Sequence, residues 1–259
     1  MGISISLICI NFLLRTLSFG LAQDVVRRYI INMYKLSPSD FAYLYEECKL
    51  CYWLKVKKGI YQPSMPMPGV FSAINTRIQS NLVGKNLKSL SKGLPDGVVD
   101  SQEGWVESKT VPGTSVFIKG KYDLLVKLPD SSHLLVDLKI SVPNDDKIEK
   151  YKTQLGAYKF ALENPARGNA VKTTRLGLLI FYPESAIFKE NEALLSFPPK
   201  WLEIPVDEKG FLEFSAEVDK LISDRAPAES KTCKWCQYRH VGEELSHLVS
   251  EVEQEEIPF

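Results

Sequence analysis

Three charged side chains lie within a segment whose other residues are mostly apolar. Asp123 belongs to the run Gly120–Val126, Asp137 and Lys139 belong to the run Leu134–Ile140, and a turn rich in Pro, Asp and Ser separates the runs. Two apolar runs of strand length around such a turn predict a β-hairpin, which can bring the carboxylates close together. A carboxylate in a buried strand is unfavourable unless it pairs with a cation or binds a metal.

These side chains have the chemistry that phosphodiester hydrolysis requires. Two carboxylates can hold a hard divalent cation such as Mg²⁺ or Mn²⁺, and the backbone carbonyl of Leu138 could add a ligand. The cation would polarise the phosphate and lower the pKa of a bound water, while Lys139 orients that water or offsets negative charge. Since side chains alternate along a strand, Asp137 and Lys139 share one face. The alternative is an ordinary charged surface hairpin, because Asp-Leu-Lys alone is common.

An amphipathic helix is predicted directly after the hairpin. Apolar residues recur at helical spacing through residues 147–164, and Pro165 marks the end. Gln154 and Tyr158 stand four residues apart and therefore share one face of this helix.

In this order and spacing, the residues resemble the PD-(D/E)XK nuclease superfamily, specifically its RecB-like branch, which includes the CRISPR-associated adaptation exonucleases. The matching segments are Gly120-x-x-Asp123, Val136-Asp137-Leu138-Lys139 and Gln154-Leu-Gly-Ala-Tyr158, and the resemblance extends over residues 36–239. It implies an α/β fold, with a restriction-endonuclease-like core in which helices flank a central mixed β-sheet. By this resemblance Asp123 and Asp137 would be metal ligands, Lys139 the catalytic lysine, and Gln154 and Tyr158 residues that line the site and help position substrate.

One part of the family's site is missing. RecB-like nucleases often carry a histidine or acidic residue on a helix before the sheet, whereas the helix predicted over residues 70–87 offers Asn75 and Gln79. The side-chain oxygen of Asn75 is a neutral, weaker metal ligand than a carboxylate. The departure leaves room for reduced activity, or for Glu103 or Glu107 to enter the site.

Four of the five cysteines form two pairs, Cys48-Lys-Leu-Cys51 and Cys233-Lys-Trp-Cys236. Such pairs have the spacing of a four-sulfur site that holds zinc or an iron–sulfur cluster, and one shared site would tie the chain ends together. Several RecB-like nucleases have an iron–sulfur site, commonly with one cysteine upstream and three downstream, whereas this chain has two and two. A [4Fe–4S] cluster is the leading expectation, with structural Zn²⁺ and separate free or disulfide-bonded cysteines as alternatives. The lone Cys9 is expected to be inert.

Composition fits one globular domain with additions at both ends. The chain has 259 residues, 44% of them hydrophobic and 25% charged, and its formal net charge is zero. Residues 240–259 contain six glutamates and no Lys or Arg, so residues 1–239 carry 32 basic and 26 acidic side chains. Within this basic part, Lys150, Lys152 and Lys159 around the predicted helix are the expected phosphate contacts.

Three segments are expected. Residues 1–32 are a non-core N-terminal extension, residues 33–239 the nuclease-like domain, and residues 240–259 an acidic tail. The apolar run Ile3–Leu14 is too short for a membrane span and lacks the positive start of a signal peptide. Because thiolate metal ligands also disfavour export, we expect a cytoplasmic protein without a membrane.

The sequence therefore predicts a divalent-metal-dependent DNA nuclease, either an exonuclease or an enzyme that acts on single strands or DNA ends, in DNA repair, recombination or CRISPR-type DNA processing. No Walker A loop is present, so ATP is not expected as a partner, and a protein partner in a DNA-processing complex fits the family. The alternative is a catalytically weakened PD-(D/E)XK-fold module that binds nucleic acid or a protein partner.

Overall fold

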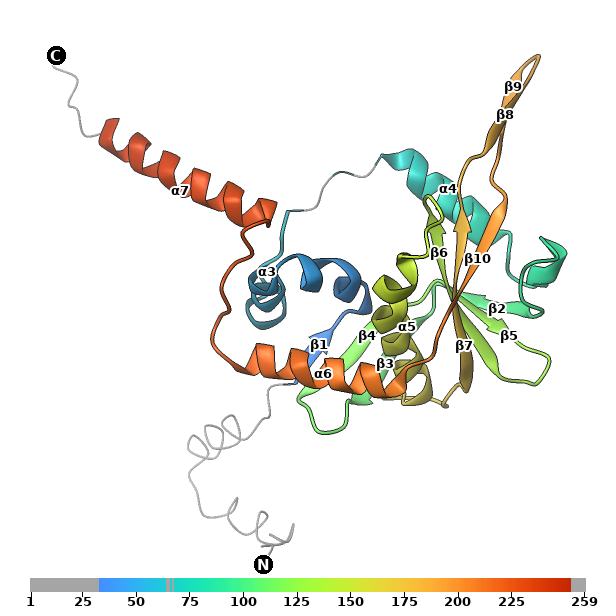
Figure 1. Ribbon diagram of the computed structural model, residues 1–259, viewed down its shortest axis with the longest axis horizontal. Helices are drawn as coiled ribbons and strands as arrows, with labels where there is room; N and C mark the ends of the chain where they lie inside the picture. The colour runs from blue at the N-terminus through green and yellow to red at the C-terminus, as the bar shows by residue number, and fades with distance from the viewer. Residues whose placement is uncertain (1–32, 64–65, 67, 253–259) are drawn as a thin grey trace, which may run out of the picture. The chain divides into compact units, whose positions relative to one another are not determined.

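The computed structural model describes residues 33–63, 66 and 68–252 (Figure 1). From Tyr34 onward the described residues belong to one structural unit. The expected extension of residues 1–32, with Cys9, lies outside the described residues, as do residues 253–259 of the expected acidic tail.

Two mixed sheets organise this unit. The larger sheet has five strands in the spatial order β10 (Pro199–Ile204), β7 (Thr173–Phe181), β6 (His133–Ile140), β5 (Leu124–Lys127) and β2 (Val98–Gln102). Its central strands β6 and β7 are parallel, and its other pairs are antiparallel. The smaller sheet has three strands in the order β1 (Tyr34–Leu36), β4 (Val116–Lys121) and β3 (Trp105–Thr110), with β1 parallel to β4 and β3 antiparallel to it.

Helices flank the larger sheet. The α-helices are α3 (Lys49–Trp53), α4 (Gly69–Ser80), α5 (Lys147–Glu163), α6 (Glu208–Ser223) and α7 (Lys234–Val252). Short helical turns of 3₁₀ or π type are η1 (Pro38–Asp40), η2 (Phe41–Tyr45), η3 (Leu54–Lys58) and η4 (Leu87–Ser89). Helices α5 and α6 contact each other, with α6 lying across the direction of α5 (Figure 1). The mixed α/β class predicted from the sequence is thereby confirmed.

Side-chain alternation along β5 and β6 divides the core into two layers. Leu125 and Leu135 pack with Tyr151 and Leu155 of α5 on one face of the sheet. Their neighbours in the strands pack on the other face, together with Ile78 of α4 and Leu87 of η4. The sheet is therefore buried on both faces, which explains the near-continuous apolar run of β7.

The predicted hairpin and helix are confirmed, with differences at their ends. Strands β5 and β6 pair antiparallel, and α5 ends at Glu163, next to the predicted boundary. Helix α4 ends at Ser80 instead of Leu87, and the chain then turns through Gly84, whose φ of 78° favours glycine. Helix α6 begins at Glu208, where Asp207 caps it by accepting a hydrogen bond from the Gly210 N–H at 2.8 Å.

One hairpin was not predicted. Strands β8 (Ser185–Lys189) and β9 (Glu192–Ser196) pair only with each other, and every residue in them is exposed. This hairpin projects between the end of β7 and the start of β10 (Figure 1). Helix α7 continues from Lys234 past residue 240, where the acidic tail was expected to begin.

Among the helices formed by the described residues, none has the length and apolar character needed to cross a membrane.

The two-layer core predicts which leucines contribute to the free energy of unfolding. Leu178 of β7 is fully buried, so Leu178→Ala should lower the free energy of unfolding by about 2–5 kcal/mol. Leu195 of β9 is 56% exposed, and Leu195→Ala should cost less than about 1 kcal/mol. Urea denaturation followed by circular dichroism measures both, and equal losses would contradict this description of the core.

Candidate functional site

One pocket of about 340 Å³ brings together the five residues singled out in the hairpin and the helix. Asp123 comes from the junction of β4 and β5, Asp137 and Lys139 from β6, and Gln154 and Tyr158 from α5. The remaining lining residues, which sequence reasoning did not assign to the site, are Lys35, Ser37, Pro38, Ser39, Trp105, Lys119, Gly120 and Lys121.

Asp123 reaches the pocket because the chain changes sheets at this point. Strand β4 belongs to the smaller sheet and β5 to the larger one, and Asp123 lies between them. The expectation that Asp123 sits inside a strand is therefore wrong. The Asp123 Oδ2 atom accepts a hydrogen bond of 2.8 Å from the Leu138 N–H. The pairing of β5 with β6 ends at Leu124 and Val136. Beyond that pair, the Asp123 carboxylate takes the place of a backbone acceptor for the next N–H of β6 on this side, that of Leu138.

This arrangement also orients the Leu138 carbonyl. The N–H and C=O groups of one residue in an extended strand point to the same side. Because the Leu138 N–H points to Asp123, its carbonyl leaves β6 on the Asp123 side as well. The Leu138 side chain lies in the apolar core on the other layer.

Asp137 is held from two sides. It is only 5% exposed; its Oδ2 lies 2.6 Å from Lys139 Nζ, and its Oδ1 accepts a hydrogen bond of 3.0 Å from Gln154 Nε2. Lys139 also lies 4.9 Å from the centroid of the Tyr151 ring. The other polar atom of the Gln154 amide, Oε1, is buried without a hydrogen-bond partner among the described residues.

The electrostatics of the pocket favour an added cation. Burial raises the pKa of Asp123, although Lys139 and the Leu138 N–H oppose the shift. Burial also raises the pKa of Asp137, and the nearby Asp123 adds to this while Lys139 opposes it. Burial lowers the pKa of Lys139, but the Asp137 carboxylate more than offsets this, so that the net shift is upward. One buried and one partly buried carboxylate, with one lysine, an unpartnered amide oxygen and a backbone carbonyl, are a donor set that fits a hard divalent cation.

Tyr158 and Gly120 fix the wall of the pocket. The Tyr158 hydroxyl donates a hydrogen bond of 2.9 Å to the Lys121 carbonyl at the end of β4. A Cβ atom at Gly120 would lie 3.0 Å from the Tyr158 ring and 3.1 Å from Pro38. The glycine three residues before Asp123 is therefore explained by the close approach of α5 to β4.

The additional ligands considered from the sequence do not line the pocket. Asn75 accepts a hydrogen bond of 3.4 Å from Gln79 within α4 and is absent from the described lining residues. Glu103 pairs with Lys121 at 2.9 Å, and Glu107 pairs with Lys119 at 2.6 Å. The carboxylates that line the pocket, as far as the structure describes it, are those of Asp123 and Asp137.

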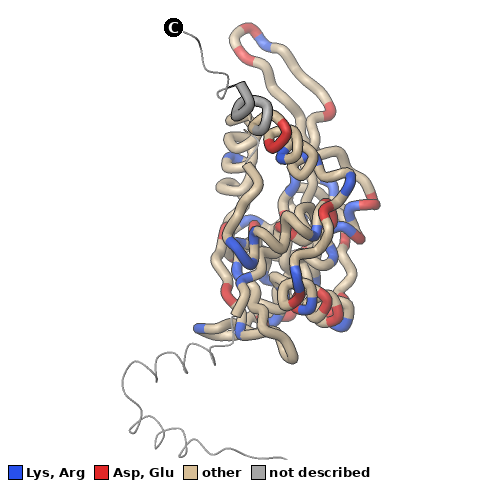
Figure 2. Tube along the Cα trace, turned by 90° about the vertical axis from the view of Figure 1, so that its left-hand side faces the viewer, with Lys and Arg blue, Asp and Glu red and all other residues tan. Residues whose placement is uncertain are grey.

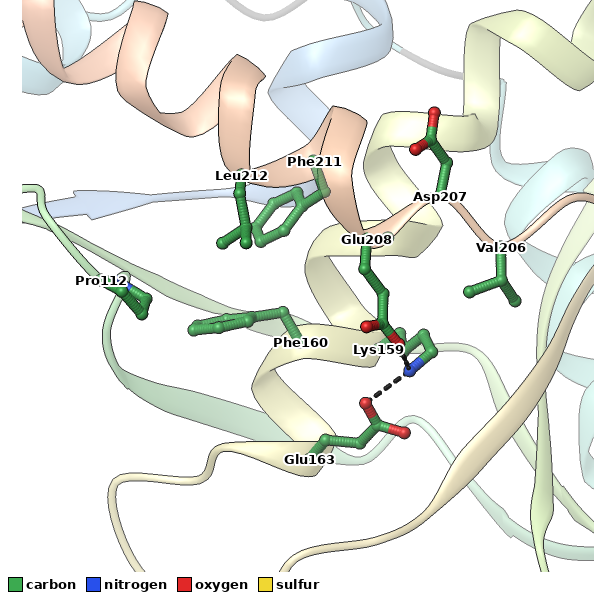
Figure 3. A pocket seen from close by; sticks show the side chains of 10 residues that line it. Pro112, Lys159, Phe160, Glu163, Val206, Asp207, Glu208, Phe211 and Leu212 are labelled. Carbon is green, nitrogen blue, oxygen red and sulfur yellow. Dashed lines mark hydrogen bonds and ion pairs between the residues drawn. The ribbon is translucent and has the colours of Figure 1, made fainter.

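Of the three lysines expected to contact phosphate, Lys159 does not fit that role. It is buried, and its Nζ lies 2.5 Å from Glu163 and 2.8 Å from Glu208 in a separate pocket between α5 and α6 (Figure 3). Lys152 pairs with Asp207 at 3.0 Å. Glu163 stands four residues after Lys159, and this spacing in the sequence already favours an ion pair within the helix over a contact with phosphate.

Lys150 and the pocket lysines remain available near the site. Lys150 lies 3.8 Å from the centroid of the Tyr43 ring, and the Tyr43 and Tyr151 hydroxyls contact each other beside Lys139. Over the described chain as a whole, basic and acidic residues are interspersed (Figure 2). The other basic side chains that line the pocket are Lys35, Lys119 and Lys121, of which Lys119 and Lys121 are paired with glutamates.

The four paired cysteines form a second site. All four are buried, and their sulfur atoms lie within 4.8 Å of one another. The Cys48–Cys236 and Cys51–Cys233 sulfurs are 3.8 Å apart, and the Cys51–Cys236 sulfurs are 3.7 Å apart. A disulfide needs about 2.05 Å, so these are four neighbouring thiols able to hold a metal. The prediction that the two pairs meet is confirmed.

The model of the PD-(D/E)XK nuclease superfamily matches residues 90–241, which is more than half of the chain and contains the five pocket residues and the second cysteine pair. No curated protein matches the chain. A solved structure titled "Crystal structure of SSO0001" is similar over 74% of this chain and 78% of that chain, with 12% sequence identity and a TM-score of 0.39.

The raised carboxyl pKa values predict how metal and pH act together. An ionised Asp123 or Asp137 opposes folding, so this part of the stability is present below the usual carboxyl pKa of about 4 and is lost as the pH rises through the raised pKa. Mn²⁺ should offset the cost only when both groups are ionised. Differential scanning fluorimetry should therefore give a larger Mn²⁺-dependent rise in melting temperature at pH 8 than at pH 5.

Asp123→Asn is the control for this measurement, because it removes one charge and preserves the shape of the side chain. The Mn²⁺-dependent rise should vanish in this variant. A rise of equal size at both pH values, or one that survives the substitution, would show that the cation binds elsewhere.

Proposed function

Because this chain belongs to the PD-(D/E)XK nuclease superfamily, we propose that it is a divalent-metal-dependent deoxyribonuclease acting on single strands or DNA ends. The observation that carries this proposal is the convergence of Asp123, Asp137, Lys139 and the Leu138 backbone in one pocket. The resemblance of the helix motif supports the RecB-like branch, and with it a role in DNA repair, recombination or CRISPR-type DNA processing.

Asp123, Asp137 and the Leu138 carbonyl are the groups that would hold Mg²⁺ or Mn²⁺. When bound, such a cation polarises the scissile phosphate and lowers the pKa of a coordinated water. Asp137 is kept in its ligating position by the hydrogen bond from Gln154, and Asp123 by the hydrogen bond from the Leu138 N–H.

Lys139 is the catalytic lysine of the proposal. Its Nζ lies 2.6 Å from Asp137, so it can donate to a water or a phosphate oxygen next to the cation. A fixed positive charge there offsets the negative charge that develops as the phosphodiester is attacked. Tyr158 has an indirect, positioning role, because its hydroxyl donates a hydrogen bond to the Lys121 carbonyl at the end of β4, two residues before Asp123.

A second function is a module that binds nucleic acid or a protein partner without efficient cleavage. One observation favours this binding module: the carboxylates that line the pocket, among the described residues, are those of Asp123 and Asp137, while Asn75 is hydrogen-bonded inside α4. Intact Asp123, Asp137 and Lys139 favour the nuclease.

Cleavage of end-labelled DNA distinguishes the two functions. With Mn²⁺, the protein should degrade single-stranded or free-ended DNA, and Lys139→Ala should lower the rate about 100-fold or more. Lys127→Ala, at the opposite end of β5 on an exposed position, is the matched control and should keep full activity. The product ladder reports the polarity of digestion. Retained DNA binding without any metal-dependent cleavage would establish the binding module instead.

For the four-cysteine site we propose a single structural Zn²⁺. Four sulfurs at about 2.3 Å from a central tetrahedral ion lie about 3.8 Å from one another. The Cys48–Cys236, Cys51–Cys233 and Cys51–Cys236 separations of 3.8, 3.8 and 3.7 Å are close to this value, and all four sulfurs lie within 4.8 Å of one another. A four-iron cube places iron and sulfide between the thiolates and so holds them farther apart than a single ion does. The sulfur spacing thus favours the zinc alternative over the expected [4Fe–4S] cluster.

Metal analysis of anaerobically purified protein tests this assignment. We expect about one zinc per chain and colourless protein, and Cys51→Ser should lower both the zinc content and the melting temperature. Stoichiometric iron with a broad visible absorption band would overturn the zinc assignment and restore the cluster.

A further inference from the structure

Trp105 opens β3 and is 73% exposed, although tryptophan is usually well covered. It lines the catalytic pocket together with Asp123, Asp137 and Lys139. It also lines a neighbouring cleft of about 660 Å³, which contains Arg167 and Asn169. Trp105 and Lys119 occur in both linings, so the indole stands on the rim that the two cavities share.

The backbone directly before Trp105 packs tightly. Gly104 precedes it, and a Cβ atom there would lie 2.2 Å from the Tyr122 ring. The Tyr122 N–H donates to the Gly104 carbonyl at 3.0 Å, and the Tyr122 hydroxyl is hydrogen-bonded to Ser101 at 2.9 Å. In this packing the Trp105 side chain lies on the outside, where it contributes little to the apolar core.

Basic side chains lie beside the indole on the same face of the smaller sheet. Trp105 is directly opposite Lys121, and Glu107 is directly opposite Lys119, so the four side chains share one face. Both lysines pair with glutamates at exposed positions, Lys121 with Glu103 and Lys119 with Glu107. Ion pairs of this kind contribute little to stability, and a lysine can exchange its carboxylate partner for a phosphate.

We propose that Trp105 is a stacking platform for a base of single-stranded DNA, next to the base whose phosphate enters the catalytic pocket. An exposed indole offers a flat π-surface, and Lys119 and Lys121 would contact the phosphates on either side. A base inside a duplex has no free face, so the platform accounts for a preference for single strands. This inference deepens the proposed nuclease function and rests on it.

The test separates binding from cleavage by using Ca²⁺ in place of Mn²⁺ and measuring the anisotropy of a labelled oligothymidine. Trp105→Ala should weaken binding about tenfold or more, whereas Trp105→Phe should keep most of the affinity. Phe188→Ala is the matched control, since Phe188 is an exposed aromatic residue on β8, outside both cavities, and this change should have no effect. Melting temperatures of all variants check that folding is preserved.

Two further measurements report stacking itself. Tryptophan fluorescence should fall when the intact protein binds DNA, and this quenching should be much smaller in Trp105→Phe. An oligonucleotide with abasic sites should bind the intact protein and Trp105→Ala equally weakly. Stacking on Trp105 is refuted if Trp105→Ala binds the normal oligonucleotide as tightly as the intact protein does. It is also refuted if the substitution weakens binding of the abasic strand by the same factor as binding of the normal strand.

The outcomes also separate this inference from the proposed function. A protein that cleaves single strands and binds them normally without Trp105 would keep its nuclease function and lose only the stacking platform. A protein that neither binds nor cleaves single-stranded DNA would lose both.

Discussion

The change of sheets between β4 and β5 is the constraint on which the site depends. The chain leaves the smaller sheet at Lys121 and enters the larger one at Leu124, and the two residues between them make the connection. Because β5 stops pairing with β6 at Val136, the Leu138 N–H needs another acceptor, and the Asp123 carboxylate supplies it. One hydrogen bond thus satisfies a strand end and places a carboxylate beside Asp137. Burial disfavours the ionised form of both carboxyl groups, and a bound cation would stabilise that form.

The rest of the fold supports this junction from two directions. Helix α5 covers one face of the larger sheet and reaches the site through Gln154 and Tyr158, while Gly120 lets it approach β4 closely. The cysteine site brings α3 to the first turn of α7, so segments far apart in the sequence meet in one small buried cluster, against which Leu50 and Trp235 pack. The proposed metal would strengthen this link by metal–ligand bonds, which can form only after folding has brought the two cysteine pairs together.

Sequence reasoning was successful where one local pattern carried the information. The hairpin followed from two apolar runs around a turn, α5 from its period, and the meeting of the cysteines from two repeated spacings. It failed where distant residues decide the outcome. Nothing around Asp123 marks a change of sheets, and the Glu208 partner that removes Lys159 from the list of phosphate contacts lies on α6, 49 residues away. The β8–β9 hairpin was missed because both its faces are exposed, so it has no buried face to impose a period on the sequence.

That hairpin lies outside the bonding pattern of the larger sheet. Phe181 of β7 and Pro199 of β10 are paired with each other, so the two strands are already side by side where the hairpin begins and ends. A tight turn joining these two residues would leave every rung of the sheet as it is. The arm of residues 182–198 is therefore a position where the chain can gain, lose or exchange length without disturbing the pocket. Among relatives of this protein, this is where the greatest variation in length is expected, while the β4–β5 junction tolerates no insertion.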